Sequence, residues 1–200
     1  MRGLIFPVLL ALAACGGGRS DDTIQFATEG SVCGDPMLRG SVIDPVDGPG
    51  RCGIDNPIRL TAVGDVQLSQ PATINCATAA ALKTWIEAGV RPAVGDTGGG
   101  LSSLRVVAHY SCRGRNNNPN ARLSEHSFGN AIDIAGIGLA DGTEMTVLSD
   151  WNGRYATQLR QMWRAACGPF GTVLGPEADV HHRDHFHFDV ADYRSGSFCR

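Results

Sequence analysis

The sequence predicts a single α+β domain held together by disulfides, and three observations lead to this prediction. The chain has 200 residues with 42% hydrophobic content, which suits one domain with a sizeable core and excludes wholesale disorder or a membrane bundle. Both helical spacing and strand alternation of apolar residues occur along it. Six of the seven cysteines remain once Cys15, at the end of an N-terminal leader, is set aside, and an even number is typical of an exported, disulfide-bonded chain.

The leader, residues 1–14, has the features of a secretory signal peptide. A charged start precedes an apolar run that is too short to span a bilayer. The run ends at Cys15 in a segment that resembles a bacterial lipoprotein box, and an ordinary cleavage site is the alternative. Lipidation of Cys15 anchors a protein to a membrane leaflet by acyl chains, with residues 15–32 as a flexible tether. We therefore expect a lipid-anchored protein on the periplasmic side of the cell envelope, on either membrane.

The first half of the chain predicts a loop-rich lobe followed by a helix. Residues 23–60 are rich in Pro, Gly and Asp and contain two cysteines, which indicates a disulfide-stapled lobe of loops. Asn75 is a suitable N-cap for a helix over residues 76–88, and Gly89 follows as a stop signal. The apolar residues at helical spacing there are Leu82, Trp85 and Ile86.

The middle and the second half predict a buried strand and a second helix. Residues 95–100 contain four glycines and are expected to form a surface loop. Residues 104–113 indicate a buried strand that ends in a polar turn with Arg113 at its tip. A helix is expected over residues 155–166, ended by Gly168-Pro169, with one apolar face made of Tyr155, Leu159, Met162, Trp163 and Ala166.

Residues 181–189 are the most unusual stretch, because four of the six histidines fall within seven positions. On a strand, side chains alternate between the two faces. Phe186 and Phe188 are therefore expected to enter the core, while His185, His187 and Asp189 line the opposite face. Neutral imidazole is the commonest protein ligand of zinc, so this strand predicts part of a metal site.

A second polar cluster can complete this site. His126 and Asp133 are separated by Gly129-Asn130, a turn that can bring the histidine back beside the carboxylate. Ile132 and Ile134 are expected to point inward.

The formal net charge of −3 and the lack of basic runs argue against nucleic acid as a partner.

The cysteines are expected to form disulfides rather than a metal site, since no CxxC or CxxxC spacing occurs. Six cysteines allow fifteen pairings, and spacing does not choose among them. We predict three bonds, pairing Cys33 with Cys52, Cys76 with Cys112, and Cys167 with Cys199.

The clusters resemble two known groups of proteins. Ser124-x-His126-x-x-Gly129-x-Ala131-x-Asp133 followed by His185-x-His187 resembles the zinc peptidase superfamily of penicillin-insensitive murein endopeptidases, D-Ala-D-Ala peptidases and hedgehog domains. Over residues 33–200 the chain is similar to the bacterial extensin-like C-terminal domain family. The superfamily resemblance implies a central, mainly antiparallel sheet flanked by helices.

The resemblance also implies roles for individual residues. One zinc ion is held by His126, Asp133 and His187, and three protein ligands leave a fourth position for water, as in catalytic zinc sites. The base that takes the proton of this water is either His185 or Asp184, and the sequence leaves both open.

The remaining implied site residues surround this base. His182 matches an additional active-site histidine of the murein endopeptidases, with a surface histidine as the alternative. Arg113 matches an arginine that holds the substrate carbonyl, although Arg115 stays possible. Ser124 is a candidate substrate-binding residue. Asp189 either orients a ligand histidine or is a plain surface carboxylate.

These observations predict an exported zinc-dependent hydrolase that acts on peptide bonds of peptidoglycan. The alternative is a non-catalytic module that keeps zinc for structure and binds the cell wall or a partner protein. A third reading is a zinc-free cluster that serves only in packing.

Overall fold

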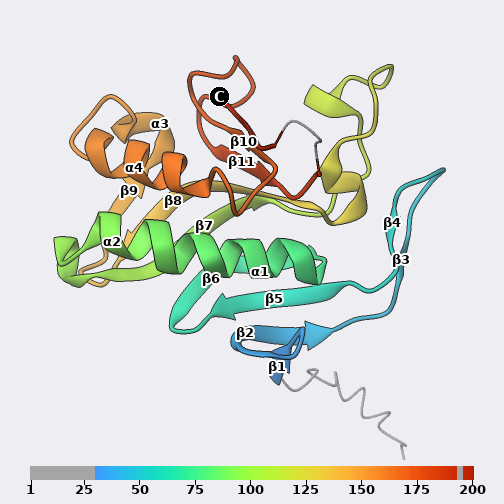
Figure 1. Ribbon diagram of the computed structural model, residues 1–200, viewed down its shortest axis with the longest axis horizontal. Helices are drawn as coiled ribbons and strands as arrows, with labels where there is room; N and C mark the ends of the chain where they lie inside the picture. Colours follow the sequence, from blue (N-terminus) through green and yellow to red (C-terminus); the bar gives the residue numbers. More distant parts are fainter. Residues whose placement is uncertain (1–29, 193–195) are drawn as a thin grey trace, which may run out of the picture.

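The structure is a computed structural model, and it describes residues 30–192 and 196–200. A large sheet dominates it, and a few helices lie across one face of this sheet (Figure 1). The predicted signal peptide, Cys15 and most of the expected tether lie outside the described residues. Among the described residues, no helix is long and apolar enough to cross a membrane.

Ten strands form one sheet in the order β1-β2-β5-β6-β7-β8-β11-β10-β12, with β9 paired to β8. Neighbouring strands are antiparallel except for β6 with β7 and β10 with β12. β3 and β4 form a separate two-stranded hairpin. The strands are β1 Gly30–Val32, β2 Asp35–Val42, β3 Val46–Asp47, β4 Gly53–Ile54, β5 Ile58–Val63, β6 Val66–Ile74, β7 Leu101–Ala108, β8 Ala131–Leu139, β9 Glu144–Thr146, β10 Thr172–Leu174, β11 Phe186–Asp189 and β12 Phe198–Cys199.

Two helices, α1 Cys76–Trp85 and α4 Ala156–Ala166, lie close to where the sequence predicts helices. The other helical segments are a π-helical turn η1 Ile86–Val90, α2 Arg91–Val94 and α3 Val147–Asp150. Short 3-10 segments are η2 Thr97–Gly99, η3 Arg115–Asn117 and η4 Glu125–Phe128. Asn75 caps α1 as expected, its side chain accepting a hydrogen bond from the backbone N–H of Thr78 at 2.9 Å.

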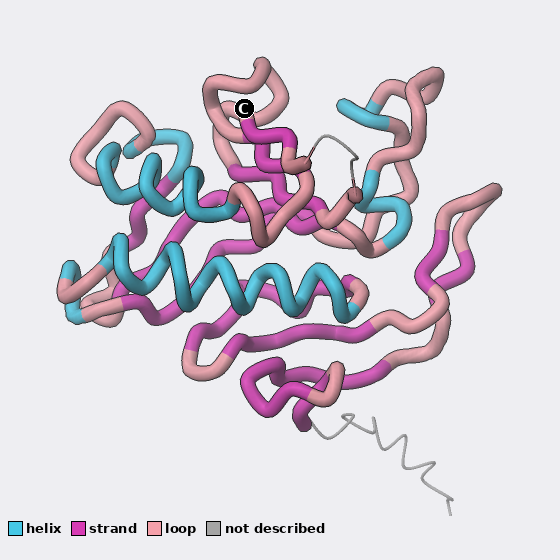
Figure 2. The backbone as a smooth tube through the Cα atoms, viewed as in Figure 1, coloured by secondary structure: helices cyan, strands magenta, loops and turns pink. Residues whose placement is uncertain are grey.

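The prediction that Gly89 ends the first helix is wrong. The helical segment runs on through η1 and α2 to Val94 and ends at Gly95, which has φ 52° (Figure 2). A Cβ at Gly89 would lie only 2.7 Å from the Cβ of Ala165 on α4. Glycine is therefore present for close helix packing, and the indole N–H of Trp85 donates across the same interface to the carbonyl of Met162 at 2.7 Å.

The predicted N-terminal lobe of loops is also wrong over the described residues. Instead, β1, β2 and β5 form one side of the large sheet. A Cβ at Gly40 would lie 2.1 Å from the carbonyl oxygen of Arg59 on the neighbouring strand, beside an irregularity in strand register. Glycine here permits a close backbone approach within a sheet rather than a loop.

Strand β7 is shorter than predicted, because it ends at Ala108 and not at Arg113. The chain leaves the sheet at His109 and enters the segment that approaches η4. The backbone N–H of Ser111 donates to the carbonyl of His126 there at 3.2 Å. The side chain of Arg113 is therefore presented by a loop.

One of the three predicted disulfides is correct. Cys167 pairs with Cys199 as expected, but Cys33 pairs with Cys76 and Cys52 pairs with Cys112. The turn between β1 and β2 brings Cys33 to the start of α1, and the β3-β4 hairpin carries Cys52 to the segment after β7. These contacts depend on the packing of elements 43 and 60 residues apart, which cysteine spacing does not encode.

The two faces of β8 and β11 differ in chemistry. The side chains of Ile132, Ile134, Phe186 and Phe188 are fully buried, and Phe188 packs edge-on against Trp85 of α1 with ring centroids 4.8 Å apart. This is the helix-covered core predicted from alternation. The opposite face carries Asp133, His187 and Asp189.

Candidate metal centre

Three donor atoms from distant parts of the chain converge on the polar face of the sheet. The Nε2 atom of His126 lies 3.1 Å from Oδ1 of Asp133 and 3.2 Å from Nδ1 of His187, and this Nδ1 lies 2.8 Å from the same Oδ1. Tetrahedral zinc with bonds of 2.0–2.1 Å separates its ligand atoms by about 3.4 Å. The three donors are therefore spaced nearly as a shared zinc ion requires.

Strand register brings two of these donors together. β8 and β11 are antiparallel, and Asp133 is directly opposite His187 although 54 residues separate them in the chain. Directly opposed side chains on one face of a sheet lie close enough to interact. Ile132 and Phe188 hold the same register from the core side, because they are also directly opposed.

His126 reaches the site from the 3-10 segment η4 through a glycine turn. Gly129 ends η4 in the left-handed conformation, with φ 68°. A Cβ at this position would lie 2.4 Å from Cδ1 of Ile54, so both backbone conformation and space require glycine. This is the turn that the sequence predicted to bring His126 beside Asp133.

One backbone carbonyl and one carboxylate decide which ring nitrogen of His126 and of His187 carries a hydrogen. The Nδ1–H of His126 donates to the carbonyl of His109 at 2.7 Å, which leaves the Nε2 lone pair facing the cluster. The Nε2–H of His187 donates to Oδ2 of Asp189 at 3.3 Å, which leaves Nδ1 facing the cluster. Metal-binding histidines commonly make such outer hydrogen bonds. Asp189 is buried, so it has the orienting position and is not a surface carboxylate.

The electrostatics of the cluster favour a cation. Burial acts to lower the pKa of His187, but its hydrogen bonds to Asp133 and Asp189 outweigh burial and raise this pKa to about 9. Burial opposes ionisation of Asp133, yet hydrogen bonds from His126 and His187 hold its pKa well below the usual range. The site therefore holds a proton at neutral pH when no metal is bound. A zinc ion would take the place of this proton, and the donor set fits such an ion.

His185 lies at the edge of the donor cluster and forms a dyad with Asp184. Its Nδ1 is 2.8 Å from Oδ1 of Asp184, and its Nε2 is 3.6 Å from Oδ2 of Asp133. The carboxylate thus lies behind the imidazole, and the other ring nitrogen faces the donor cluster. His185 directly precedes β11, one position before the strand that was predicted to contain it.

His182 forms a second dyad of the same kind. Its Nδ1 is 2.8 Å from Oδ1 of Asp179, and its ring centroid lies 5.3 Å from that of His185 and 5.7 Å from that of His187. Burial lowers the pKa of His182, and the hydrogen bond to Asp179 opposes this effect only in part. His182 is buried, and its lowered pKa favours the neutral imidazole at pH 7, with the proton on Nδ1 where it donates to Asp179.

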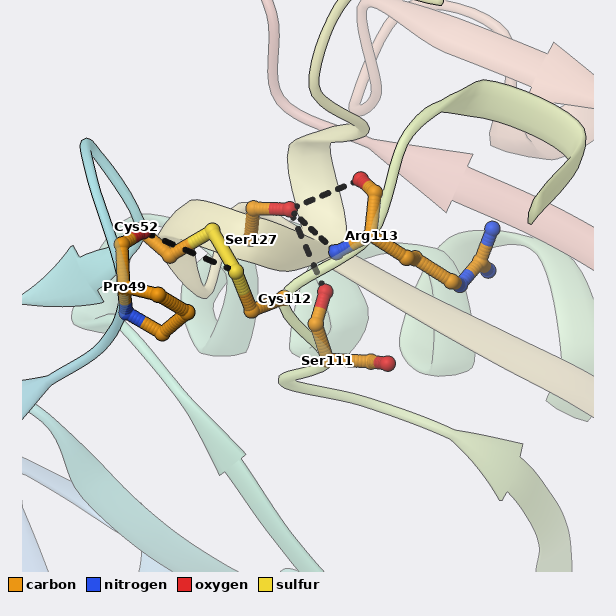
Figure 3. The surroundings of a disulfide bond; sticks show 6 residues. All are labelled: Pro49, Cys52, Ser111, Cys112, Arg113 and Ser127. Atoms are coloured by element: carbon orange, nitrogen blue, oxygen red, sulfur yellow. Dashed lines mark hydrogen bonds between the residues drawn. A yellow bond between two sulfur atoms is a disulfide. The ribbon is translucent and has the colours of Figure 1, made fainter. Parts of the chain in front are cut away.

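Arg113 points toward the site from a fixed stretch of backbone. Its guanidinium nitrogen Nη2 is 3.9 Å from Oδ2 of Asp133. Figure 3 shows the side chain extending away from the Cys52–Cys112 disulfide, which tethers the preceding residue. The buried hydroxyl of Ser127 accepts from the backbone N–H of Arg113 at 3.1 Å and lies within bonding distance of the carbonyls of Ser111 and Arg113.

A pocket with a volume of about 140 Å³ adjoins the cluster. Ser124, the predicted substrate-binding residue, lines it and is buried. Arg113 and its sequence alternative Arg115 both line the pocket. The other lining residues are Asn116, Glu125, Thr172, Leu174, His182, His187, Asp189 and Phe198.

Comparison with known proteins places the chain in a family. The family model described as extensin-like protein C-terminus matches residues 37–200. The chain belongs to this family. No curated protein and no solved structure shows significant similarity to it.

Sequence reasoning missed three residues that shape the centre of this extensin-like domain. These are His109, whose carbonyl orients His126, Ser127, which fixes the Arg113 backbone, and Asp179, which pairs with His182. Asp179 stands three positions before His182, so its spacing was a usable signal. The carbonyl of His109 and the hydroxyl of Ser127 gave none, because their partners depend on how the loops fold.

Proposed function

We propose that this chain is an exported zinc-dependent hydrolase that cleaves peptide bonds of peptidoglycan. One observation carries the proposal: His126 Nε2, His187 Nδ1 and Asp133 Oδ1 converge within 3.2 Å of one another. Atoms at this spacing share a cation, either the proton that His187 carries without metal or a metal ion that replaces it. Three protein ligands beside a pocket are the arrangement of a catalytic rather than a structural zinc site.

The residues around the cluster supply the other parts of a hydrolytic mechanism. Zinc bound there would polarise a carbonyl and lower the pKa of water to about 7. His185 takes the proton of the attacking water at Nε2, and Asp184 holds its Nδ1–H and stabilises the imidazolium that forms. Arg113 offers its guanidinium to the oxyanion that develops on the carbonyl. In this assignment His185 is the base and Asp184 orients it.

The two sequence alternatives for the base thus act together in the proposal. Asp184 is the more exposed partner, since 65% of its side chain is accessible compared with 16% for His185. The more enclosed imidazole is closer to the donor atoms. The His185 imidazolium returns the proton of the attacking water to the leaving amine, and the neutral His182, with Asp179 behind it, is suited to accept a hydrogen bond from that amine at Nε2.

The wider proposal uses the resemblance stated from the sequence. We propose that the chain is related to the superfamily of murein endopeptidases, D-Ala-D-Ala peptidases and hedgehog domains and shares their fold. We also propose that a lipid on Cys15 anchors it on the periplasmic side of the envelope. Peptidoglycan peptides are the substrates that a protein in this location can reach.

Cleavage of purified sacculi is the direct test. The purified protein is loaded with zinc, incubated with sacculi with and without a chelator, and compared with His185→Ala. We expect released muropeptides only from zinc-loaded protein with His185 intact. Elemental analysis is expected to give one zinc per chain, and His126→Ala to give none.

The non-catalytic alternative has a distinct result in the same assay. Zinc-loaded protein that sediments with sacculi, releases no peptides and binds equally well as His185→Ala would be a wall-binding module. A folded protein that retains no zinc would leave the cluster with a packing role only.

A further inference from the structure

We propose that Arg115, with Asn116, forms a binding subsite for a peptide carboxylate beside the metal centre. This inference rests on the proposed function, because it names a feature of the substrate that the same site accepts. It starts from the pocket of about 140 Å³, which reaches from the cluster residue His187 to Arg115 and Asn116 on the segment after β7.

Arg115 is the charged residue of this pocket whose side chain has no partner among the residues that the structure describes. Glu125 accepts a hydrogen bond from Asn130 at 2.8 Å, and Asp189 accepts from His187 and from the backbone N–H of Ala191 at 3.0 Å. Arg113 faces Asp133. The Arg115 side chain makes no hydrogen bond or ion pair with any described residue. An unpaired guanidinium at a pocket wall is suited to bind a carboxylate in bidentate fashion.

Backbone hydrogen bonds hold the segment that carries Arg115 in place. The backbone N–H of Arg115 donates to the carbonyl of Arg122 at 3.0 Å, and its carbonyl accepts from Asn118 at 3.1 Å. Gly114 pairs with Leu123 in an isolated bridge. Asn116 and Asn117 both adopt the left-handed conformation, with φ 54° and 55°, which asparagine tolerates better than most residues.

The base of this segment is anchored beside the metal centre. At its beginning, the disulfide between Cys52 and Cys112 ties the segment to the β3-β4 hairpin (Figure 3). At its end, the backbone N–H of Ser124 donates to the carbonyl of Arg113 at 2.9 Å. A fixed base keeps the distance between Arg115 and the donor cluster nearly constant. Such a fixed distance allows the enzyme to select a bond by its separation from a charge.

Two apolar residues in the pocket wall suit the body of a peptide residue. Phe198 is an exposed large hydrophobic residue, with 47% of its surface accessible, and Leu174 lies in the same wall. A peptide that lays a small apolar side chain against them would direct its carboxylate to Arg115. The carboxylate is either the C-terminus of the peptide or an acidic side chain, since both have the same chemistry.

Binding of three short peptides to the full chain tests the subsite without relying on turnover. The probes are N-acetyl-D-Ala-D-Ala, its C-terminal amide, and N-acetyl-D-Glu-D-Ala amide, whose one carboxylate is on a side chain. Affinities are measured by calorimetry with chelator present, so that no probe is cleaved. We expect at least one acid probe to bind about 10-fold more tightly than the amide. Which probe gains identifies the source of the carboxylate.

Variants decide whether Arg115 is responsible for this preference. Arg115→Gln is expected to remove it and Arg115→Lys to restore part of it. Arg122→Gln is the matched control, because Arg122 is on the same segment, exposed and outside the pocket. Equal binding of all three probes by the unchanged protein, or an acid preference that survives Arg115→Gln, would overturn the proposal.

The outcome is separable from that of the hydrolase. A carboxylate preference that depends on Arg115, in a protein that releases nothing from sacculi, supports the subsite and contradicts the peptidase. Cleavage that proceeds while Arg115→Gln leaves the binding preference unchanged supports the peptidase and contradicts the subsite.

Discussion

The two faces of strands β8 and β11 are both buried but have different requirements. On the helix side, Ile132 and Phe188 are fully enclosed by apolar groups and need no further partner. On the other side, Asp133 and His187 are also buried, but they are polar and hydrogen-bond to each other at 2.8 Å. One face of these strands therefore holds the fold, while the other holds a pair of polar groups that share a proton.

Truncation of the apolar face is expected to have the largest effect on stability. Phe188→Ala removes a fully buried ring that contacts Trp85 and Phe170, so we expect a loss of about 3–5 kcal/mol in the free energy of unfolding. Chemical denaturation measures this loss. Val107→Ala, at an exposed position of the same sheet, is the control and should change stability little. Comparable losses for both variants would contradict the assigned core.

Removal of a donor on the polar face is expected to act on the metal instead. His126→Ala should weaken zinc binding by at least about 100-fold, beyond the usual cost of removing an outer partner. Competition with a chromogenic chelator measures the affinity. His181→Ala is the matched control, since this exposed histidine belongs to the same cluster in sequence but not to the donor set. Equal zinc affinity for the two variants would exclude the proposed ligands.

Loss of an outer carboxylate is expected to weaken zinc binding less. Asp189→Asn keeps the shape of the side chain but removes the charge that accepts from Nε2 of His187, so zinc affinity should fall by about 10–100-fold. Asp192→Asn, at an exposed position just after β11, should have no effect. A larger loss for Asp189→Asn than for His126→Ala would mean that Asp189 is itself a ligand.

The most gradual expected effect is a pH dependence of the metal-free protein. The pKa of His187 is raised to about 9 in the folded state from an ordinary value of 6.5. The stability gained from this proton is complete below pH 6.5 and is lost as the pH rises through 9. The unfolding free energy should therefore fall across this window with a slope of at most about 1.4 kcal/mol per pH unit.

Zinc should abolish this slope, because it replaces the proton on Nδ1 of His187. The corresponding expectation for binding is that zinc affinity rises with pH up to about 9. Denaturation curves at several pH values, with chelator and with saturating zinc, measure both. A metal-free protein whose stability is constant from pH 6.5 to 9 would contradict the raised pKa.

Much of the apolar face was predictable from local patterns. Alternation placed Phe186 and Phe188 in the core, and helical spacing placed residues 156–166 in a helix. The Asn75 cap followed from side-chain chemistry within four residues. These features depend on interactions between near neighbours in the chain, which spacing encodes directly.

The errors share one physical cause. Gly89 suggested a helix end and the composition of residues 23–60 suggested loops, but Gly89 and Gly40 each permit close contact with another element. The pairing of Cys33 and of Cys52 likewise follows from which elements pack together. Local composition shows that a residue is small or can form a disulfide, but it does not show which distant residue it will contact in the folded chain.

By itself the sequence indicated where the polar cluster lies: strand alternation and the glycine turn brought forward His126, Asp133, His185, His187 and Asp189, and the family resemblance implied His126, Asp133 and His187 as the ligand set. Only the tertiary structure decided their tautomers, the pairing of Asp184 with His185, and the place of Arg115 at the pocket wall with no partner in residues 30–192 and 196–200. The reason is that side-chain chemistry is a property of each single residue. The direction of a hydrogen bond and the pairing of a charge depend instead on neighbours that folding brings from distant parts of the chain.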